Sequence, residues 1–388
     1  MIRVALTLIR LGAGFVGLAL LASLWASPDR LASLPWFAIA MVGVVLVLAV
    51  TGRWLTQVAK KIRPVHLVAF FVVATFIALG SALLASRWPS YKLSWLNSVY
   101  AFLPSIRSLP FWWTQQGLQP NQTGAMLAVC TGFTAALALT PWSETRGGTA
   151  TRPTADGVGV SPIWRWIAAV LSVAGVIVVF MTGSRAALAG LVVAVLLILI
   201  VRTRRWLWAW GAGIGAMVVS LYASGTLAPI FHFFVHDETL DTKLVARLDI
   251  WSSALRGIED HPLTGIGLGV FNKVMPVRYP YQTVGLSYPV TQAHNLFLDV
   301  ALAIGLPGTL GLAMLLLGSA LLAIGGLQLR GASRVLSLGI LASIAAFLVF
   351  GITDQISLSI PTSFILWLWA CGLAIIHERA RTERQSGP

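Results

Sequence analysis

Long apolar runs recur along the whole chain and are separated mostly by short polar links. Each run is close to the roughly 20 residues that an α-helix needs to cross about 30 Å of hydrocarbon. We expect ten membrane-spanning helices, at residues 4–25, 34–51, 65–86, 121–140, 164–182, 185–201, 206–222, 304–328, 335–352 and 361–377. The pattern therefore predicts an all-α polytopic membrane protein.

Lysine and arginine gather in alternate links between these runs. They follow the second, fourth, sixth, eighth and tenth runs, as Arg53, Lys60, Lys61, Arg63, Arg146, Arg152, Arg165, Arg202, Arg204, Arg205, Arg330, Arg334, Arg379, Arg381 and Arg384. Positive residues near the ends of spans mark the cytoplasmic side, so both chain termini are expected in the cytoplasm. The first run has no Ala-x-Ala cleavage signature close behind it and is expected to remain as a signal anchor.

Two polar segments then fall on the outer side of the membrane. The first, residues 87–121, is rich in aromatic residues, and four prolines within it disfavour a long helix. We expect it to lie along the membrane surface. Two roles remain open for it, an interfacial anchor or a surface that receives a lipid or glycolipid.

The second polar segment, residues 222–299, holds seven of the 13 acidic residues, namely Asp237, Glu238, Asp241, Asp249, Glu259, Asp260 and Asp299. Ionisable residues in so apolar a chain are usually retained for a function. The chain is accordingly divided into a membrane bundle at 1–221, an outer loop domain at 222–303 and further spans with a tail at 304–388.

Helical periodicity is clear within the outer domain. A helix capped by Asp241 and ended by His261-Pro262 places five apolar residues on one face: Leu244, Leu248, Trp251, Leu255 and Ile258. Arg247 lies three residues after the first of these and four before Trp251, so it is predicted to lie against that face. A solvated or headgroup-binding arginine is the alternative.

Composition excludes a soluble globular chain, because 57% of the residues are hydrophobic, only 10% are charged and the mean hydropathy is +0.83. The net charge of +14 is explained by the positive links, so no nucleic-acid partner is expected. Cys130 and Cys371 lie within apolar runs without metal-ligand spacing, and a packing role is expected for both.

The connection between runs 164–182 and 185–201 is short and carries Arg185 near the start of a helix. Free amides at a helix N-terminus favour anions, and a guanidinium can grip phosphate in a bidentate way. Arg185 is therefore a predicted phosphate ligand, with snorkelling to the interface as the alternative. The glycine-rich run 265–271 lacks a surrounding βαβ unit, so we expect a close-approach loop and not a dinucleotide site.

His294 stands where the polar segment meets an apolar run, and histidine suits proton transfer near neutral pH. It is the predicted general base, against a structural alternative. Asp354, the one acid in the last outer loop, has three open roles: orienting a base, binding a sugar hydroxyl or capping a helix. His232 and His236, followed by Asp237, have a possible metal spacing but lack a further ligand pattern.

Three segments resemble the O-antigen ligase and polymerase superfamily of bacterial inner-membrane glycosyltransferases. They are Gly183-Ser184-Arg185, then Arg247 to Trp251 leading into residues 261–271, then residues 293–299 with 305–308. They occur in the family's order and cover about the second half of the chain. Ligases of this family commonly have twelve spans where ten are found here, so we expect 10–12.

The resemblance implies a GT-C-like fold in the bacterial inner membrane with one large periplasmic helical loop. It implies transfer of O-polysaccharide from undecaprenyl pyrophosphate to lipid A-core at the periplasmic face, among membrane lipids, with inversion and without a metal, cofactor or nucleotide sugar. Arg185 and Arg247 match the arginines that hold the pyrophosphate, and His294 matches the histidine that activates the acceptor hydroxyl. Three further residues are possible supports: Ser184, Asn295 and Asp354.

Two other activities remain open. An O-antigen polymerase uses the same donor but adds to another lipid-linked glycan, and more often displays two comparable outer loops. A lipid-linked sugar flippase or transporter is expected to line a midplane cavity with polar residues. One large outer loop and nearly uncharged spans favour the ligase.

Overall fold

The computed structural model shows 14 helical elements within the residues that it describes. It describes residues 1–388 except 90–92, 104–117, 141–160, 204–210, 213–214, 217–218, 221–239, 285–289, 355–363 and 386–388. The elements are α1 (Ile2–Ala26), α2 (Arg30–Thr51), α3 (Leu55–Lys61), α4 (Pro64–Ala85), η1 (Ser94–Leu96), α5 (Asn97–Phe102), α7 (Pro120–Ala138), α9 (Pro162–Met181), α10 (Arg185–Arg202), α13 (Leu240–Asp260), α14 (Phe271–Arg278), α15 (Leu296–Gly326), α16 (Gly331–Thr353) and α17 (Phe364–Gln385).

Nine of the ten predicted spans coincide with helices of the bundle, namely α1, α2, α4, α7, α9, α10, α15, α16 and α17. Within the described residues, seven helices are long and apolar enough to cross a membrane, and these are all of the nine except α7 and α17. The remaining predicted span, 206–222, falls largely outside the described residues. An all-α, multi-pass membrane protein is confirmed.

Helix α7 lies inside the bundle, packed against α4, α9, α10 and α16. Its residues from Thr123 to Leu137 are buried except for the half-buried Met126, and many are small, which lets neighbouring backbones approach closely. Hydroxyl groups add contacts between helices: Ser343 Oγ donates to the Val129 carbonyl at 2.8 Å, and Ser172 Oγ to Thr134 Oγ1 at 2.9 Å. Helix α7, which is not among the seven helices apolar enough to cross a membrane, is therefore accommodated by burial within the protein.

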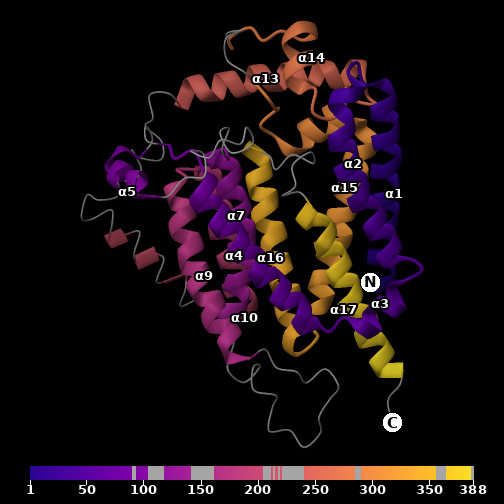
Figure 1. Cartoon of the computed structure of the whole chain (residues 1–388), viewed down its shortest axis with the longest axis vertical. Coiled ribbons are helices and arrows are strands. Elements are labelled where there is room, and N and C mark those ends of the chain that lie inside the picture. Colours follow the sequence, from indigo (N-terminus) through magenta and orange to yellow (C-terminus); the bar gives the residue numbers. More distant parts are fainter. Residues whose placement is uncertain are drawn as a thin grey trace, which may run out of the picture.

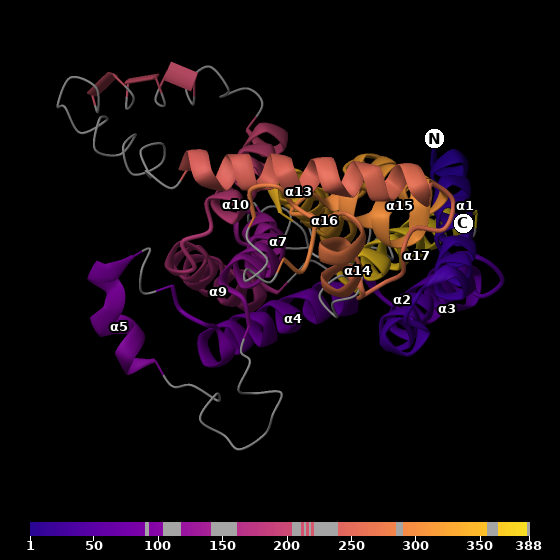
Figure 2. The ribbon, with the colours of Figure 1, turned by 90° about the horizontal axis from the view of Figure 1, so that it is seen from above.

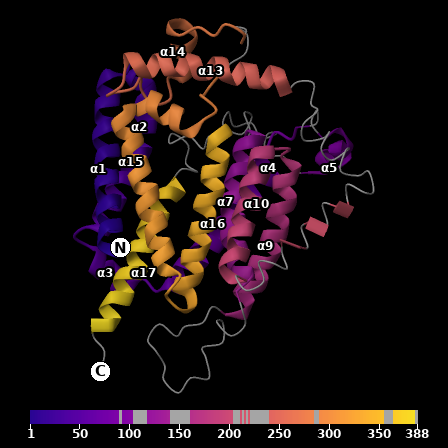
Figure 3. The same ribbon diagram turned by 180° about the vertical axis from the view of Figure 1, so that it is seen from behind.

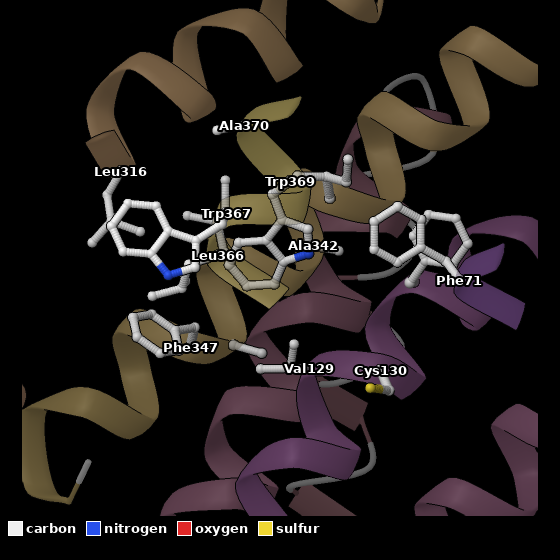
Figure 4. Close-up of a cluster of buried hydrophobic side chains, with 14 of the residues drawn as sticks. Phe71, Val129, Cys130, Leu316, Ala342, Phe347, Leu366, Trp367, Trp369 and Ala370 are labelled. Carbon is white, nitrogen blue, oxygen red and sulfur yellow. The ribbon is translucent and has the colours of Figure 1, made fainter. Parts of the chain in front are cut away.

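Aromatic side chains from three other helices fill the core beside α7 (Figure 4). The Phe347 and Trp369 rings meet edge to face with centroids 6.2 Å apart, and Trp367 is 1% exposed. Cys130 and Cys371 are both buried and unpaired, as expected from their place in apolar runs.

Helix α13 lies across one end of the bundle, with α14 beyond it and the end of α17 at the opposite end (Figures 1 and 3). Seen from above, it passes over the ends of α10, α16 and α15 (Figure 2). We call this end of the bundle the α13 end. The end of α16, the start of α15 and the turn between α9 and α10 all lie at the α13 end.

Helix α15 is broken near its start, where Ile304 (φ −131°) and Gly305 (φ 75°) leave the helical region. The break coincides with the start of the predicted span at 304, and the helix itself begins earlier, at Leu296. A break frees backbone carbonyls that need other partners. The glycine-rich loop supplies them: Ile266 N donates to the Leu302 carbonyl at 2.8 Å and Gly267 N to the Ala303 carbonyl at 3.1 Å.

Gly267 has a φ of 110°, and a Cβ there would lie 2.5 Å from Ser27 Oγ. A side chain is therefore excluded by both backbone conformation and space. This confirms the predicted role of residues 265–271 as a loop that allows close backbone approach.

Only part of the predicted apolar face of α13 is packed against the protein. Leu244, Leu248 and Leu255 are 49%, 56% and 49% exposed, whereas the packed face carries Ile250 and Ala254 at 4% and 0%. The apolar residues of α13 cover a wider part of the helix surface than the side that packs against the rest of the protein. Periodicity alone does not say which of these residues will be packed. Arg247 borders the packed face, because it is three residues before Ile250.

The ends of α13 were predicted with mixed success. The helix ends at Asp260, directly before His261-Pro262, as predicted. It begins at Leu240, so Asp241 lies in the first turn and is not the N-cap. A cap prediction depends on locating the first helical residue, which sequence patterns define only to within one or two positions.

The described part of the aromatic segment 87–121 forms only short helices before α7 begins, η1 and α5. It is attached to the bundle: Trp88 stacks on Tyr100 with centroids 5.4 Å apart, and Tyr100 Oη donates to the Met181 carbonyl at 2.8 Å. Trp95 and Phe102 are 67% and 89% exposed. The absence of a long helix in the described part agrees with the prolines.

Candidate functional site

His294 lies in the link that precedes α15, with a φ of 52°. A left-handed conformation is uncommon for a residue other than glycine, and such strain persists only where the surroundings hold it. Here two hydrogen bonds hold the preceding residue, Ala293. Ala293 N donates to Asp299 Oδ1 at 3.0 Å, and the Ala293 carbonyl accepts from Trp251 Nε1 at 2.8 Å.

Asn295 holds the other side of His294. Its Oδ1 accepts from Phe297 N and Leu298 N at 3.0 and 3.1 Å, which makes it the N-cap of α15. Its Nδ2 donates to the Ile352 carbonyl at 3.0 Å and so joins the start of α15 to the end of α16. Asn295, a predicted supporting residue, thus fixes the histidine backbone.

The structure brings Asp354 to His294. His294 Nδ1 lies 3.2 Å from Asp354 Oδ1, and the aspartate side chain is 2% exposed while the imidazole is 28% exposed. A carboxylate at Nδ1 selects the tautomer that carries its proton there, which leaves Nε2 as an acceptor. Asp354 also ends α16 as its C-cap residue, through its backbone N–H to the Phe350 carbonyl.

Two amides also contact the Asp354 carboxylate. Gln292 Nε2 donates to Oδ1 at 2.7 Å, and Asn121 Nδ2 donates to Oδ2 at 3.0 Å. Sequence reasoning missed both, since neither amide lies in a motif and Asn121 comes from a different helix, α7. Gln292 is 5% exposed in the structure, and the sequence offered only its place two residues before the histidine as a signal.

Arg185 is the first residue of α10, directly after a turn in which Gly183 has a φ of 61°. Ser184 is the N-cap, and its Oγ accepts from Ala187 N at 3.4 Å. The first residues of α7 pack against this turn, because a Cβ on Gly124 would lie 2.7 Å from Thr182 Oγ1. The half-buried Arg185 is therefore placed at the α13 end of the bundle.

The first turn of α7 connects both parts of the site. Asn121 contacts Asp354, and Gly124 packs against the turn that leads into Arg185. The two positions are three residues apart along the same helix, so they are neighbours on its surface. The histidine pair and Arg185 are thus held at the same end by one helical turn.

Arg247 reaches this end from α13. It lies one helical turn before Trp251, whose indole contacts the residue next to His294. Its side chain is half-buried, and it makes no hydrogen bond or ion pair with any described residue. A half-buried guanidinium without a carboxylate partner is suited to an anionic ligand.

The nearest acid in sequence does not neutralise Arg247. Asp249 Oδ2 accepts from the backbone N–H groups of Gln282, Thr283 and Val284 at 2.8, 2.6 and 3.3 Å, and also from the Thr283 hydroxyl. Burial raises the pKa of Asp249, but these hydrogen bonds outweigh it and hold the pKa below its usual value. The Asp249 carboxylate is therefore hydrogen-bonded to the loop after α14.

A hollow of about 520 Å³ lies between the end of α13 and the end of α14, lined by Arg256, Glu259, Asp260 and residues 278–282. None of the predicted site residues lines it.

His232, His236 and Asp237 fall outside the described residues. The described part of the chain holds no group of three or more histidine, cysteine, aspartate or glutamate residues that is arranged to bind a metal ion.

Comparison with known protein families gives a match over part of the chain. Residues 167–313 match the family model described as O-Antigen ligase. The matched segment runs from α9 into α15 and contains Arg185, Arg247 and His294, whereas Asn121 and Asp354 lie outside it. The match confirms the predicted relationship to the O-antigen ligase and polymerase superfamily. No curated protein matches the chain.

Proposed function

We propose, from this family relationship, that the protein is an O-antigen ligase. It transfers O-polysaccharide from undecaprenyl pyrophosphate to a hydroxyl of lipid A-core at the periplasmic face of the bacterial inner membrane. The observation that carries the proposal is the contact of His294 with buried Asp354. The link that contains His294 is also hydrogen-bonded to α13, the helix that bears Arg247.

The histidine supplies the base. His294 Nε2 takes the proton of the acceptor hydroxyl while that oxygen attacks the anomeric carbon of the donor. The bond from this carbon to the pyrophosphate oxygen breaks, its electron pair leaves with the pyrophosphate, and the configuration inverts. Asp354 holds the Nδ1 proton and stabilises the imidazolium that forms. General-base catalysis of this kind contributes about 10²–10⁴-fold in rate.

The arginines stabilise the leaving group. Charge builds up on the pyrophosphate as the bond breaks, and two guanidinium groups in fixed positions neutralise it without rearranging. Arg185 acts together with the free amides at the start of α10, which point at the same anion. Arg247 approaches from α13. On this proposal the arginines neutralise the leaving group and transfer needs no metal.

The distribution of charge supports the orientation. Lys60 and Lys61 end α3, and Arg330 and Arg334 lie at the link between α15 and α16. The end of the bundle with positive links is expected in the cytoplasm, which leaves the α13 end in the periplasm.

Purified protein with a lipid-linked donor and lipid A-core tests the proposal. We expect His294→Ala and Arg247→Ala to remain folded and monodisperse in detergent and to lose transfer by about 10²-fold or more. Full activity in either variant contradicts the mechanism. Loss of wild-type activity with chelator, restored by Mg²⁺, contradicts the metal-independent part.

The same assay separates the ligase from its alternatives. A ligase needs lipid A-core as the acceptor, whereas an O-antigen polymerase elongates one lipid-linked glycan with another in its absence. A flippase moves the lipid-linked glycan across vesicle membranes without making a glycosidic bond. Elongation without lipid A-core identifies the polymerase.

A further inference from the structure

The Asp354 carboxylate is held from two separate elements of the fold. Gln292, in the link before α15, donates to Oδ1 at 2.7 Å, and Asn121, on α7, donates to Oδ2 at 3.0 Å. His294 Nδ1 contacts the same Oδ1 at 3.2 Å. Both carboxylate oxygens therefore have a fixed donor, and the plane of the carboxylate is set before any substrate binds.

We propose that Gln292 and Asn121 are positioning residues for the transfer reaction, which aim Asp354 at His294 Nδ1. This inference rests on the proposed function, because it needs His294 to act as the base. Neither amide is required to touch substrate. Each acts through the carboxylate, and together they replace the freedom of an aspartate side chain with one orientation.

Burial makes this positioning strong. Asp354 is 2% exposed and Gln292 is 5% exposed, so water competes little for the carboxylate oxygens. A hydrogen bond to an ionised group in such surroundings contributes more than one between neutral groups. Gln292 Nε2 also lies 3.5 Å from His294 Nδ1, so the amide limits where the imidazole can turn.

Asn121 gives the positioning a second consequence. It lies on the same turn of α7 as Gly124, which packs against the Thr182 side chain in the turn before Arg185. Asn121 therefore fixes the position of His294 relative to Arg185, the predicted pyrophosphate ligand, as well as relative to the link before α15. The distance between attacking hydroxyl and leaving group depends on that relation.

Near-isosteric variants without donors provide the test. Gln292→Met and Asn121→Leu are measured against Gln122→Met, which changes the neighbouring half-buried amide on α7 that makes no hydrogen bond with any described residue. We expect the first two variants to lower kcat by about 10- to 100-fold, with the KM for the donor unchanged, since a bond to a charged acceptor is lost. Gln122→Met stays near wild type.

The Asp354→Asn background decides whether the amides act through the carboxylate. In that background, each amide change is expected to lower kcat by no more than about twofold, because the group they aim is already lost. Full additivity of the losses, or wild-type kcat in both single variants, overturns the inference. The two amides come from different elements, so a folding failure of one variant leaves the other to decide.

The outcomes separate this inference from the proposed function. If His294→Ala and Asp354→Asn are inactive while both amide variants are fully active, only the positioning role fails. If His294→Ala transfers at the wild-type rate, the proposed base fails and the amides have nothing to aim.

Discussion

Replacing Trp251 with phenylalanine removes one hydrogen bond at the residue next to the proposed base. The indole Nε1 donates to the Ala293 carbonyl at 2.8 Å, and phenylalanine keeps most of the ring packing but has no donor. A hydrogen bond of this kind contributes about 0.5–1.5 kcal/mol net. The link it holds includes His294 at φ 52°, a conformation that costs roughly 1–3 kcal/mol and needs support.

Among the described residues, the Trp251 indole makes the only side-chain hydrogen bond from α13 to the Ala293 carbonyl, and the substitution removes it. If the whole loss falls on the competent position of His294, kcat falls by about 2- to 12-fold, because 1.4 kcal/mol corresponds to tenfold. Donor KM changes little. Trp166→Phe is the matched control, since Trp166 on α9 is 66% exposed.

Steady-state transfer kinetics, with thermal unfolding in detergent as a check on folding, measure the effect. An unchanged kcat in Trp251→Phe refutes the argument that this bond maintains the strained histidine. A loss beyond about 100-fold in a stably folded variant also refutes it, because one neutral hydrogen bond is too small to cause that loss.

Three further changes test other parts of the site. Asp354→Asn is expected to lower kcat by up to about 10⁴-fold with little change in KM, because the amide no longer selects the productive tautomer of His294; transfer kinetics measure this. Gly124→Ala places a Cβ 2.7 Å from a threonine oxygen beside Arg185 and is expected to raise the donor KM more than the acceptor KM. The lowered pKa of Asp249 implies stability that is present above pH 3.8, the usual value, and is lost as the pH falls through the lower folded pKa. Asp249→Asn is expected to flatten the dependence of the unfolding temperature on pH in this acidic range.

The spans could be predicted, and three reactive residues could be proposed, because their signals are local. An apolar run of about 20 residues identifies a membrane helix without knowledge of its neighbours. Arg185 and His294 stand at junctions between apolar and polar sequence, which a single chain displays directly. Helix α7 was also found, although its polar start and small residues place it below the hydropathy of the seven spans.

The contacts around the base could not be predicted, since they join segments far apart in sequence. Asn121 and Asp354 are separated by more than half of the chain, and nothing in either segment indicates the other. Which edge of α13 packs against the protein could not be predicted for the same reason. Leu248 and Ile250 are equally apolar, and only the positions of α14 and α15 decide which one is buried.

Helix α13 is fixed near both the middle and the end by bonds to backbone groups of the α15 region. Trp251 donates to the Ala293 carbonyl, and the loop after the helix donates through Ile266 and Gly267 to carbonyls freed by the break in α15. None of these bonds involves a titratable group or an ion pair that salt screens. The position of Arg247 relative to His294 is therefore set by the fold itself. Salt is then expected to weaken the binding of the anionic donor more than it disturbs the geometry of the base.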